Sequence, residues 1–181
     1  AGYPRQYLGK HYNAAAVLEA GEIRHIYHKA LLPNDSVFDE VRYFNKGSEP
    51  LVIDHQGHKL GILICADVWM PGPARRAKEA GAELLLVLNA SPYHINKQQE
   101  RHEVARSRAT ETGLPVIYAN LVGGQDELVF DGASFVMSDE GALTQQLPSF
   151  EEALGIVNVS DTGPEPAEIV LVPELEPAVY A

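Results

Sequence analysis

The single cysteine of this sequence, Cys65, follows a short apolar run at residues 61–64. The run has the β-branched bias of a strand that is buried on both faces. The apolar pattern breaks after Cys65, and α/β proteins often place reactive side chains where a buried strand leaves its sheet. Cys65 is therefore a candidate nucleophile, although a lone cysteine also serves as a small buried hydrophobe.

A cysteine nucleophile needs a proton acceptor and a positive charge where an oxyanion develops. Lys29 is the candidate for the positive charge, because it ends an expected strand at residues 23–27 and precedes a loop that contains Pro33. That position allows its side chain to enter a pocket shared with Cys65. The alternative is a solvated surface lysine.

Histidines offer a different reading, in which a Cys–His pair or a metal site carries the chemistry. The candidates are His25, His28, His55, His58, His94 and His102. None of them combines zinc-ligand spacing with a carboxylate, so we expect no metal site. We interpret them as solvated or hydrogen-bonded, and His94 alone is of interest because it follows the Ser91 loop.

Composition narrows the class of protein. The chain has 181 residues, enough for one domain with a substantial core. With 14 Lys and Arg against 25 Asp and Glu, the net charge of −11 argues against a nucleic-acid or anionic membrane surface. One cysteine excludes an internal disulfide framework and fits a reducing compartment. No signal peptide or membrane-spanning run is visible, so we expect a cytoplasmic protein.

The order of the expected elements indicates an α/β fold. A hairpin at residues 13–27 and a strand at 51–54 precede the Cys65 strand, and residues 1–4 read as a strand end with a turn. A helix at 73–80, a strand at 83–89, a helix at 96–112 and a strand at 114–120 follow, which is typical of parallel strands with crossover helices. We further expect a turn at 70–73, a loop at 123–124, a turn at 129–132 and a last strand at 152–159.

Several motifs, in the same order along the chain, resemble the nitrilase superfamily of carbon–nitrogen hydrolases. They are KALLPN at residues 29–34, FDEVRYF at 38–44, ICADVW at 64–69 and NASPY at 89–93. More narrowly, residues 12–18 and 118–135 resemble the glutaminase domain of glutamine-dependent NAD+ synthetases. The resemblance covers about residues 2–159.

The resemblance implies a four-layer αββα sandwich, usually paired across subunits, so we expect a homo-oligomer. It also implies that residues 1–160 form a glutamine amidohydrolase domain that lacks its N-terminal strands. Residues 161–181, rich in Pro and Glu, would be a linker toward a synthetase domain that is not present in this chain. Both ends of the sequence are thus expected to be cuts through a larger protein.

The catalytic residues of the family are Glu, Lys and Cys. By resemblance, Cys65 attacks the side-chain amide of glutamine to give a thioester and ammonia, and Lys29 stabilises the tetrahedral intermediate. The general base of the family is a Glu from an N-terminal strand–loop, before the counterpart of Tyr12, and we expect it to be absent from this chain. Glu40 matches a second Glu that holds the catalytic Lys in many members, with a surface charge as the alternative.

Substrate contacts are also implied by the resemblance. Ser91 and Lys97 match positions that bind the amino and carboxylate ends of glutamine, and a cation suits a carboxylate. Trp69 would form a wall of the pocket, or else belong to the core. Ala66 and Asp35 depart from the common residues near the expected pocket, so they affect the expected substrate preference more than the chemistry.

The leading hypothesis is a glutamine amidohydrolase that supplies ammonia to a synthetase domain for the formation of NAD+. The amidohydrolase step needs no cofactor, whereas ATP, Mg²⁺ and deamido-NAD+ are expected in the synthetase domain. The alternatives are a stand-alone nitrilase-like amidase acting on another small amide, and a non-catalytic fragment that lacks the base.

Overall fold

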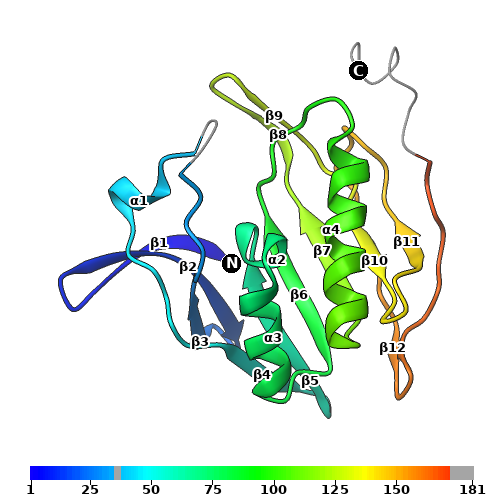
Figure 1. Ribbon diagram of the computed structural model, residues 1–181, viewed down its shortest axis with the longest axis horizontal. Coiled ribbons are helices and arrows are strands. Elements are labelled where there is room, and N and C mark those ends of the chain that lie inside the picture. The colour runs from blue at the N-terminus through cyan, green and yellow to red at the C-terminus, as the bar shows by residue number, and fades with distance from the viewer. Residues whose placement is uncertain (35–37, 172–181) are drawn as a thin grey trace. The chain divides into compact units, whose positions relative to one another are not determined.

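The computed structural model describes residues 1–34 and 38–171 and shows a chain of two units, residues 1–85 and residues 86–181 (Figure 1). The expected site residue Asp35 lies outside the described residues. Within the described part, no helix has both the length and the apolar composition to cross a membrane.

The first unit contains an antiparallel sheet with strand order β1-β2-β3, an antiparallel β4–β5 hairpin and three helices among its described residues. Its elements are β1 (Gly2–Tyr7), β2 (Lys10–Glu19), β3 (Glu22–His28), α1 (Glu40–Tyr43), β4 (Leu51–His55), β5 (His58–Ile64), α2 (Ala66–Trp69) and α3 (Pro71–Glu79).

Two-residue turns fix the register of the two hairpins that the sequence predicts. Ala20 and Gly21 join β2 to β3, and Gln56 and Gly57 join β4 to β5, all four with positive φ. Positive φ at both central residues matches the right-handed twist of paired strands. The predicted hairpins are therefore confirmed. The expected turn at residues 1–4 is wrong, because β1 continues to Tyr7 as an edge strand, where a proline such as Pro4 is tolerated.

The Cys65 strand is buried as predicted. Ile62, Leu63 and Ile64 in β5 are each less than a tenth exposed, and β5 contacts both α2 and α3. The expected turn at 70–73 is wrong, because Pro71 is the first residue of α3. A proline is favoured at that position, since its missing N–H would have no partner inside the helix.

The second unit carries the strand order β11-β10-β7-β6 with α4 packed on β7 and β10 (Figure 1). Its elements are β6 (Leu84–Asn89), which begins at the boundary, α4 (Lys97–Thr112), β7 (Val116–Asn120), β8 (Val122–Gln125), β9 (Leu128–Asp131), β10 (Phe135–Met137), β11 (Leu143–Gln146), β12 (Val159–Ser160) and β13 (Gly163–Pro164).

The β6–α4–β7 segment is the predicted crossover. The N–H of Leu121 donates to the carbonyl of Asn89, and the Asn89 amide donates to the carbonyl of Ala119, so the carboxyl ends of β6 and β7 lie together. The two strands therefore run parallel. Gly113 has a positive φ of 63° and ends α4, as the sequence predicts.

Three expectations for the second unit are wrong. The expected loop at 123–124 and the expected turn at 129–132 belong instead to the antiparallel hairpin β8–β9. Gly123 and Gly124 were expected to form a loop because glycines are depleted in strands. Residues 152–158 form no strand, and pairing begins only at Val159. The α/β class is confirmed, and each unit has its own buried core.

Candidate active site

Cys65 lies on a strained turn between β5 and α2. Its φ of 43° and ψ of −102° are rare for a residue with a side chain. Such a conformation costs on the order of 1–3 kcal/mol, and it is found most often at functional sites. Cys65 thus combines a rare backbone conformation with a place at the end of a buried strand.

Lys29 is almost fully buried, at 1% exposure, directly after β3. Its Nζ donates to Oε1 of Glu40 at 2.5 Å. Glu40 is the first residue of α1, and its Oε2 accepts a hydrogen bond from the amide of Asn13 at 3.3 Å. The lysine is therefore not a solvated surface residue, and it forms an ion pair with Glu40. The roles of both residues in catalysis remain predictions.

Asp67 connects the two strand ends that carry Lys29 and Cys65. It is fully buried, and its Oδ1 accepts from the N–H groups of Ala30 at 3.1 Å and Leu31 at 2.8 Å. Oδ2 accepts from the Tyr27 hydroxyl at 2.9 Å and from the N–H of Ile64 at 3.1 Å. A carboxylate accepts hydrogen bonds at both oxygens, so these four donors match the ionised form.

Burial and opposing charges set the state of the thiol. Burial raises the pKa of Cys65, and the charges of Glu40 and Asp67 raise it further, whereas Lys29 and the N–H of Ala66 lower it. The resting side chain is therefore a neutral thiol. A general base has to remove its proton when a substrate binds.

Burial also raises the pKa of Asp67, and the hydrogen bonds from Leu31, Ile64 and Tyr27 hold that rise in check. The pKa of Tyr27 is raised as well, first by burial and then by the negative charge of Asp67. Tyr27 therefore keeps its proton and donates a hydrogen bond to the carboxylate.

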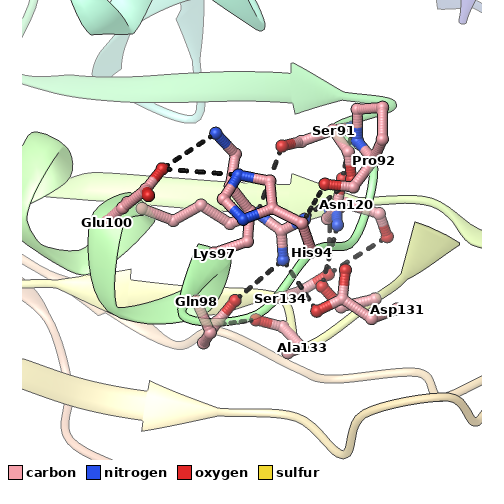
Figure 2. Close-up of polar contacts among 12 residues, drawn as sticks. Ser91, Pro92, His94, Lys97, Gln98, Glu100, Asn120, Asp131, Ala133 and Ser134 are labelled. Carbon is pink, nitrogen blue, oxygen red and sulfur yellow. Dashed lines mark hydrogen bonds and ion pairs between the residues drawn. The ribbon is translucent and has the colours of Figure 1, made fainter. Parts of the chain in front are cut away.

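The second unit holds the two residues expected to contact the substrate ends, Ser91 and Lys97 (Figure 2). Ser91 is 3% exposed, and its N–H donates to Oδ1 of Asn120 at 3.0 Å. Lys97 is the first residue of α4, and its Nζ donates to Oε2 of Glu100 at 3.0 Å. Their roles toward a substrate remain predictions.

Arg101 organises this part of the second unit and was missed in the sequence. Its guanidinium is fully buried and donates to Oδ2 of Asp131 at 2.8 Å and to Oε1 of Gln98 at 3.0 Å. It also donates to Oγ of Ser91 at 3.2 Å and to the carbonyls of Ser91 and Pro92. The Ser91 loop is thus held by one buried cation.

The remaining candidates are less informative. Trp69 ends α2 and is half-buried. Nδ1 of His94 lies 2.8 Å from the carbonyl of Ile95, and its Nε2 lies 3.7 Å from Oε2 of Glu100. Across residues 1–34 and 38–171, no three His, Cys, Asp or Glu side chains gather as metal ligands would.

Asp67 and Arg101, which organise the two hydrogen-bond networks, differ in how far the sequence alone could identify them. Asp67 is a carboxylate two positions after Cys65, where the apolar run breaks, and its place beside the candidate nucleophile could have marked it. Arg101 stands among many polar residues of a helix, so nothing in the sequence separates it from its neighbours.

An α/β fold with a buried lysine–glutamate pair and a cysteine on a strained turn defines a class of hydrolase-like proteins, and solved structures agree. A mutant amidase from Nesterenkonia, described as belonging to the nitrilase superfamily, matches 81% of this chain and 55% of its own at 29% identity, with a TM-score of 0.69. The sequence pattern of the carbon-nitrogen hydrolase family matches residues 1–167. This chain belongs to the carbon-nitrogen hydrolase family.

Several relatives of this chain are proteins named glutamine-dependent NAD(+) synthetase. The one from Aquifex aeolicus is 53% identical over 142 residues, 78% of this chain and 25% of the relative. The one from Acinetobacter baylyi is 44% identical over 146 residues, 81% of this chain and 27% of the relative. The chain therefore spans about a quarter of these relatives.

A solved structure gives the same picture. The glutamine-dependent NAD+ synthetase from Acinetobacter baumannii, in complex with ADP, matches 96% of this chain and 34% of its own. The identity is 39% and the TM-score 0.91. The fold of the described residues is thus found within a protein about three times as long.

Proposed function

We propose that this chain is the glutamine amidohydrolase part of a glutamine-dependent NAD+ synthetase. The observation that carries the proposal is the buried ion pair of Lys29 and Glu40, whose lysine charge acts on the Cys65 thiol. The NAD+ synthetase relatives, at 44–53% identity, support it over a stand-alone amidase, since the Nesterenkonia amidase shares only 29%.

The steps use Cys65, Lys29 and Glu40 of this chain, a general base, glutamine and water. The Cys65 sulfur attacks the amide carbon of glutamine as a general base takes the thiol proton, and Lys29 stabilises the oxyanion. Collapse of the tetrahedral intermediate breaks the carbon–nitrogen bond, and the nitrogen gains the proton that the base took from the thiol. Ammonia departs, and the acyl group remains on Cys65 as a thioester. Water then attacks the thioester, and glutamate is released with the thiol restored. Glu40 holds Lys29 in place through both steps.

In a solved structure of a mutant Nesterenkonia amidase, the acetamide moiety of fluoroacetamide is covalently added to the active site cysteine. This supports the assignment of Cys65 as the nucleophile. We assign Ser91 and Lys97 to the two ends of glutamine, with Trp69 and Asp35 as further pocket residues. Residues 1–160 would form the amidohydrolase domain and residues 161–181 the linker.

The rest of the proposal concerns a longer protein. ATP, Mg²⁺ and deamido-NAD+ would act in its synthetase part, which would use the ammonia, and the protein would be a cytoplasmic homo-oligomer. The amidohydrolase reaction proposed for the present residues uses neither ATP, Mg²⁺ nor deamido-NAD+. It requires only that ammonia leaves in a form the synthetase part can use.

The test measures ammonia release from glutamine by the 181-residue chain and by the full-length gene product, each with and without Cys65→Ala. We expect release from the longer protein and none after Cys65→Ala. Labelling with a glutamine-like diazoketone should add one group, which peptide mapping places on Cys65. A longer protein that hydrolyses acetamide or propionamide but not glutamine would contradict the proposal in favour of a small-amide amidase.

A further inference from the structure

The four hydrogen bonds of Asp67 are concentrated around the two reactive side chains. Ala30 and Leu31 directly follow Lys29, Tyr27 precedes it by two residues, and Ile64 directly precedes Cys65. A carboxylate needed only to begin α2 would bond locally. Three of the four partners instead lie 36 to 40 positions away in the chain.

We infer that Asp67 is a positioning residue that fixes the strand end carrying Lys29 against the turn carrying Cys65. It does not touch the reacting atoms in this scheme, and it acts through the other two residues. The inference deepens the proposed amidohydrolase function and, for its effect on turnover, rests on it. Displacing a catalytic group by about 1 Å can cost roughly 100-fold in rate. Hydrogen bonds that fix the positions of Lys29 and Cys65 should therefore affect the rate.

The four hydrogen-bond partners of Asp67 explain why a carboxylate serves better at this position than a neutral residue. Its four partners are all donors, and the three backbone N–H groups cannot accept. An ionised carboxylate accepts all four at once, whereas the NH₂ group of an asparagine would face Tyr27 and Ile64 with a donor. Asp67→Asn therefore keeps the volume of the side chain and breaks the connection at Oδ2.

The pKa of the Cys65 thiol reports how close the charge of Lys29 lies to the sulfur. Cys65 is the only thiol in the chain, so alkylation by iodoacetamide, followed by intact mass across a range of pH, gives its pKa. Lys29→Met removes a cation that lowers the thiol pKa, so that pKa should rise in the wild-type background. In the Asp67→Asn background the rise should be less than about half as large, because the strand end that carries Lys29 is held less firmly against the turn that carries Cys65.

Asp54→Asn is the matched control. It makes the same chemical change at the other end of the β4–β5 hairpin, where Oδ1 of Asp54 accepts from the N–H of Gly57 at 3.1 Å. The shift caused by Lys29→Met should be unchanged in that background. If Asp67→Asn does not fold, Tyr27→Phe removes one donor to the same carboxylate, and it should reduce the shift in the same direction.

Turnover supplies a second readout that a purely structural role would not produce. Asp67→Asn should lower kcat for glutamine roughly 100-fold while KM changes much less, because Lys29 and Cys65 are both still present but displaced from one another. A wild-type protein without glutaminase activity would refute the proposed function, and the alkylation cycle would still decide the role of Asp67. An equal Lys29→Met shift in the wild type and in whichever Asp67 or Tyr27 variant folds would overturn the inference.

Discussion

The two units of the chain each bury a polar hub, and the hubs have opposite charges. In the first unit the Asp67 carboxylate accepts from three backbone N–H groups and one hydroxyl. In the second the Arg101 guanidinium donates to two carbonyls, a hydroxyl, an amide and the Asp131 carboxylate. Both connect segments that are distant in sequence through hydrogen bonds to a buried ion.

The difference lies in what each hub holds. The partners of Asp67 flank Lys29 and Cys65, so its hydrogen bonds bear on reactive groups. Arg101 forms an ion pair with Asp131 and holds the Ser91 loop, so its loss should be felt first as lost folding energy. We therefore expect changes in the first hub to affect rate and changes in the second to affect stability.

The largest expected effect is on the stability of the second hub. Arg101→Met leaves Asp131, 2% exposed, without its charged partner, and breaking a buried ion pair in this way costs about 3–5 kcal/mol of the free energy of unfolding. Urea unfolding of the purified variants measures it. Arg106→Met on the same helix is the control, because Arg106 is exposed and donates only to the carbonyl of Gly141, so it should cost about 1 kcal/mol or less. Similar losses in both variants would remove the distinction between the hubs.

The second prediction concerns rate in the first unit. Lys29→Met should lower kcat for glutamine by about 100- to 1000-fold, because the oxyanion loses its cation, while KM changes much less. Lys46→Met, at an exposed lysine of the same unit, should leave both constants unchanged. Steady-state assays on the full-length protein measure them. A variant that loses affinity but keeps kcat would assign Lys29 to binding instead.

The third prediction tests the support behind the nucleophile. A Cβ on Gly61 would lie 3.0 Å from Cβ of Ala82 and 3.1 Å from both Ala77 and Leu85, so Gly61→Ala should cost about 1–3 kcal/mol through overpacking. Gly72→Ala is the control, since its Cβ would meet only the end of Arg76 at 3.6 Å. Thermal unfolding compares the two. Equal stability would show that β5 can shift to make room.

Much of the first unit was predictable from the sequence, because its signals are local. The paired turn residues and the apolar run before Cys65 give the hairpins and the buried strand directly. The ion pair of Lys29 and Glu40 was anticipated only through the resemblance, since the two residues lie 11 positions apart in the sequence.

The second unit shows where local signals fail. Gly123 and Gly124 have poor strand propensity, yet they pair with Phe130 and Val129 in the β8–β9 hairpin, because tertiary pairing outweighs propensity. Arg101 and Asp131 are 30 positions apart, and no pattern in one sequence marks them as partners. Long-range pairing of charges is decided by packing, which only the structure displays.

The smallest expected effect is a pH dependence that the second hub imposes on stability. Burial lowers the pKa of His102, and the charges of Arg106 and Arg101 lower it further, against an opposing hydrogen bond with Gln146. The unfolded chain, with a histidine pKa of about 6.5, thus binds more protons than the folded chain just below that pH. Stability should be complete above about pH 6.5 and fall as the pH drops through the folded pKa, by at most about 1.4 kcal/mol per pH unit.

Urea midpoints measured from about pH 8 to pH 5 should show this slope, and His102→Gln should remove it. His28→Gln in the first unit is the matched comparison. Burial and the nearby Arg5 also lower the pKa of His28, but its ring is more accessible and pairs with a guanidinium at the surface of the β1-β2-β3 sheet, so its contribution should be smaller. A larger loss of slope in His28→Gln than in His102→Gln would mean that the burial of His102 does not set the pH response, and that the pair of Arg5 and His28 does.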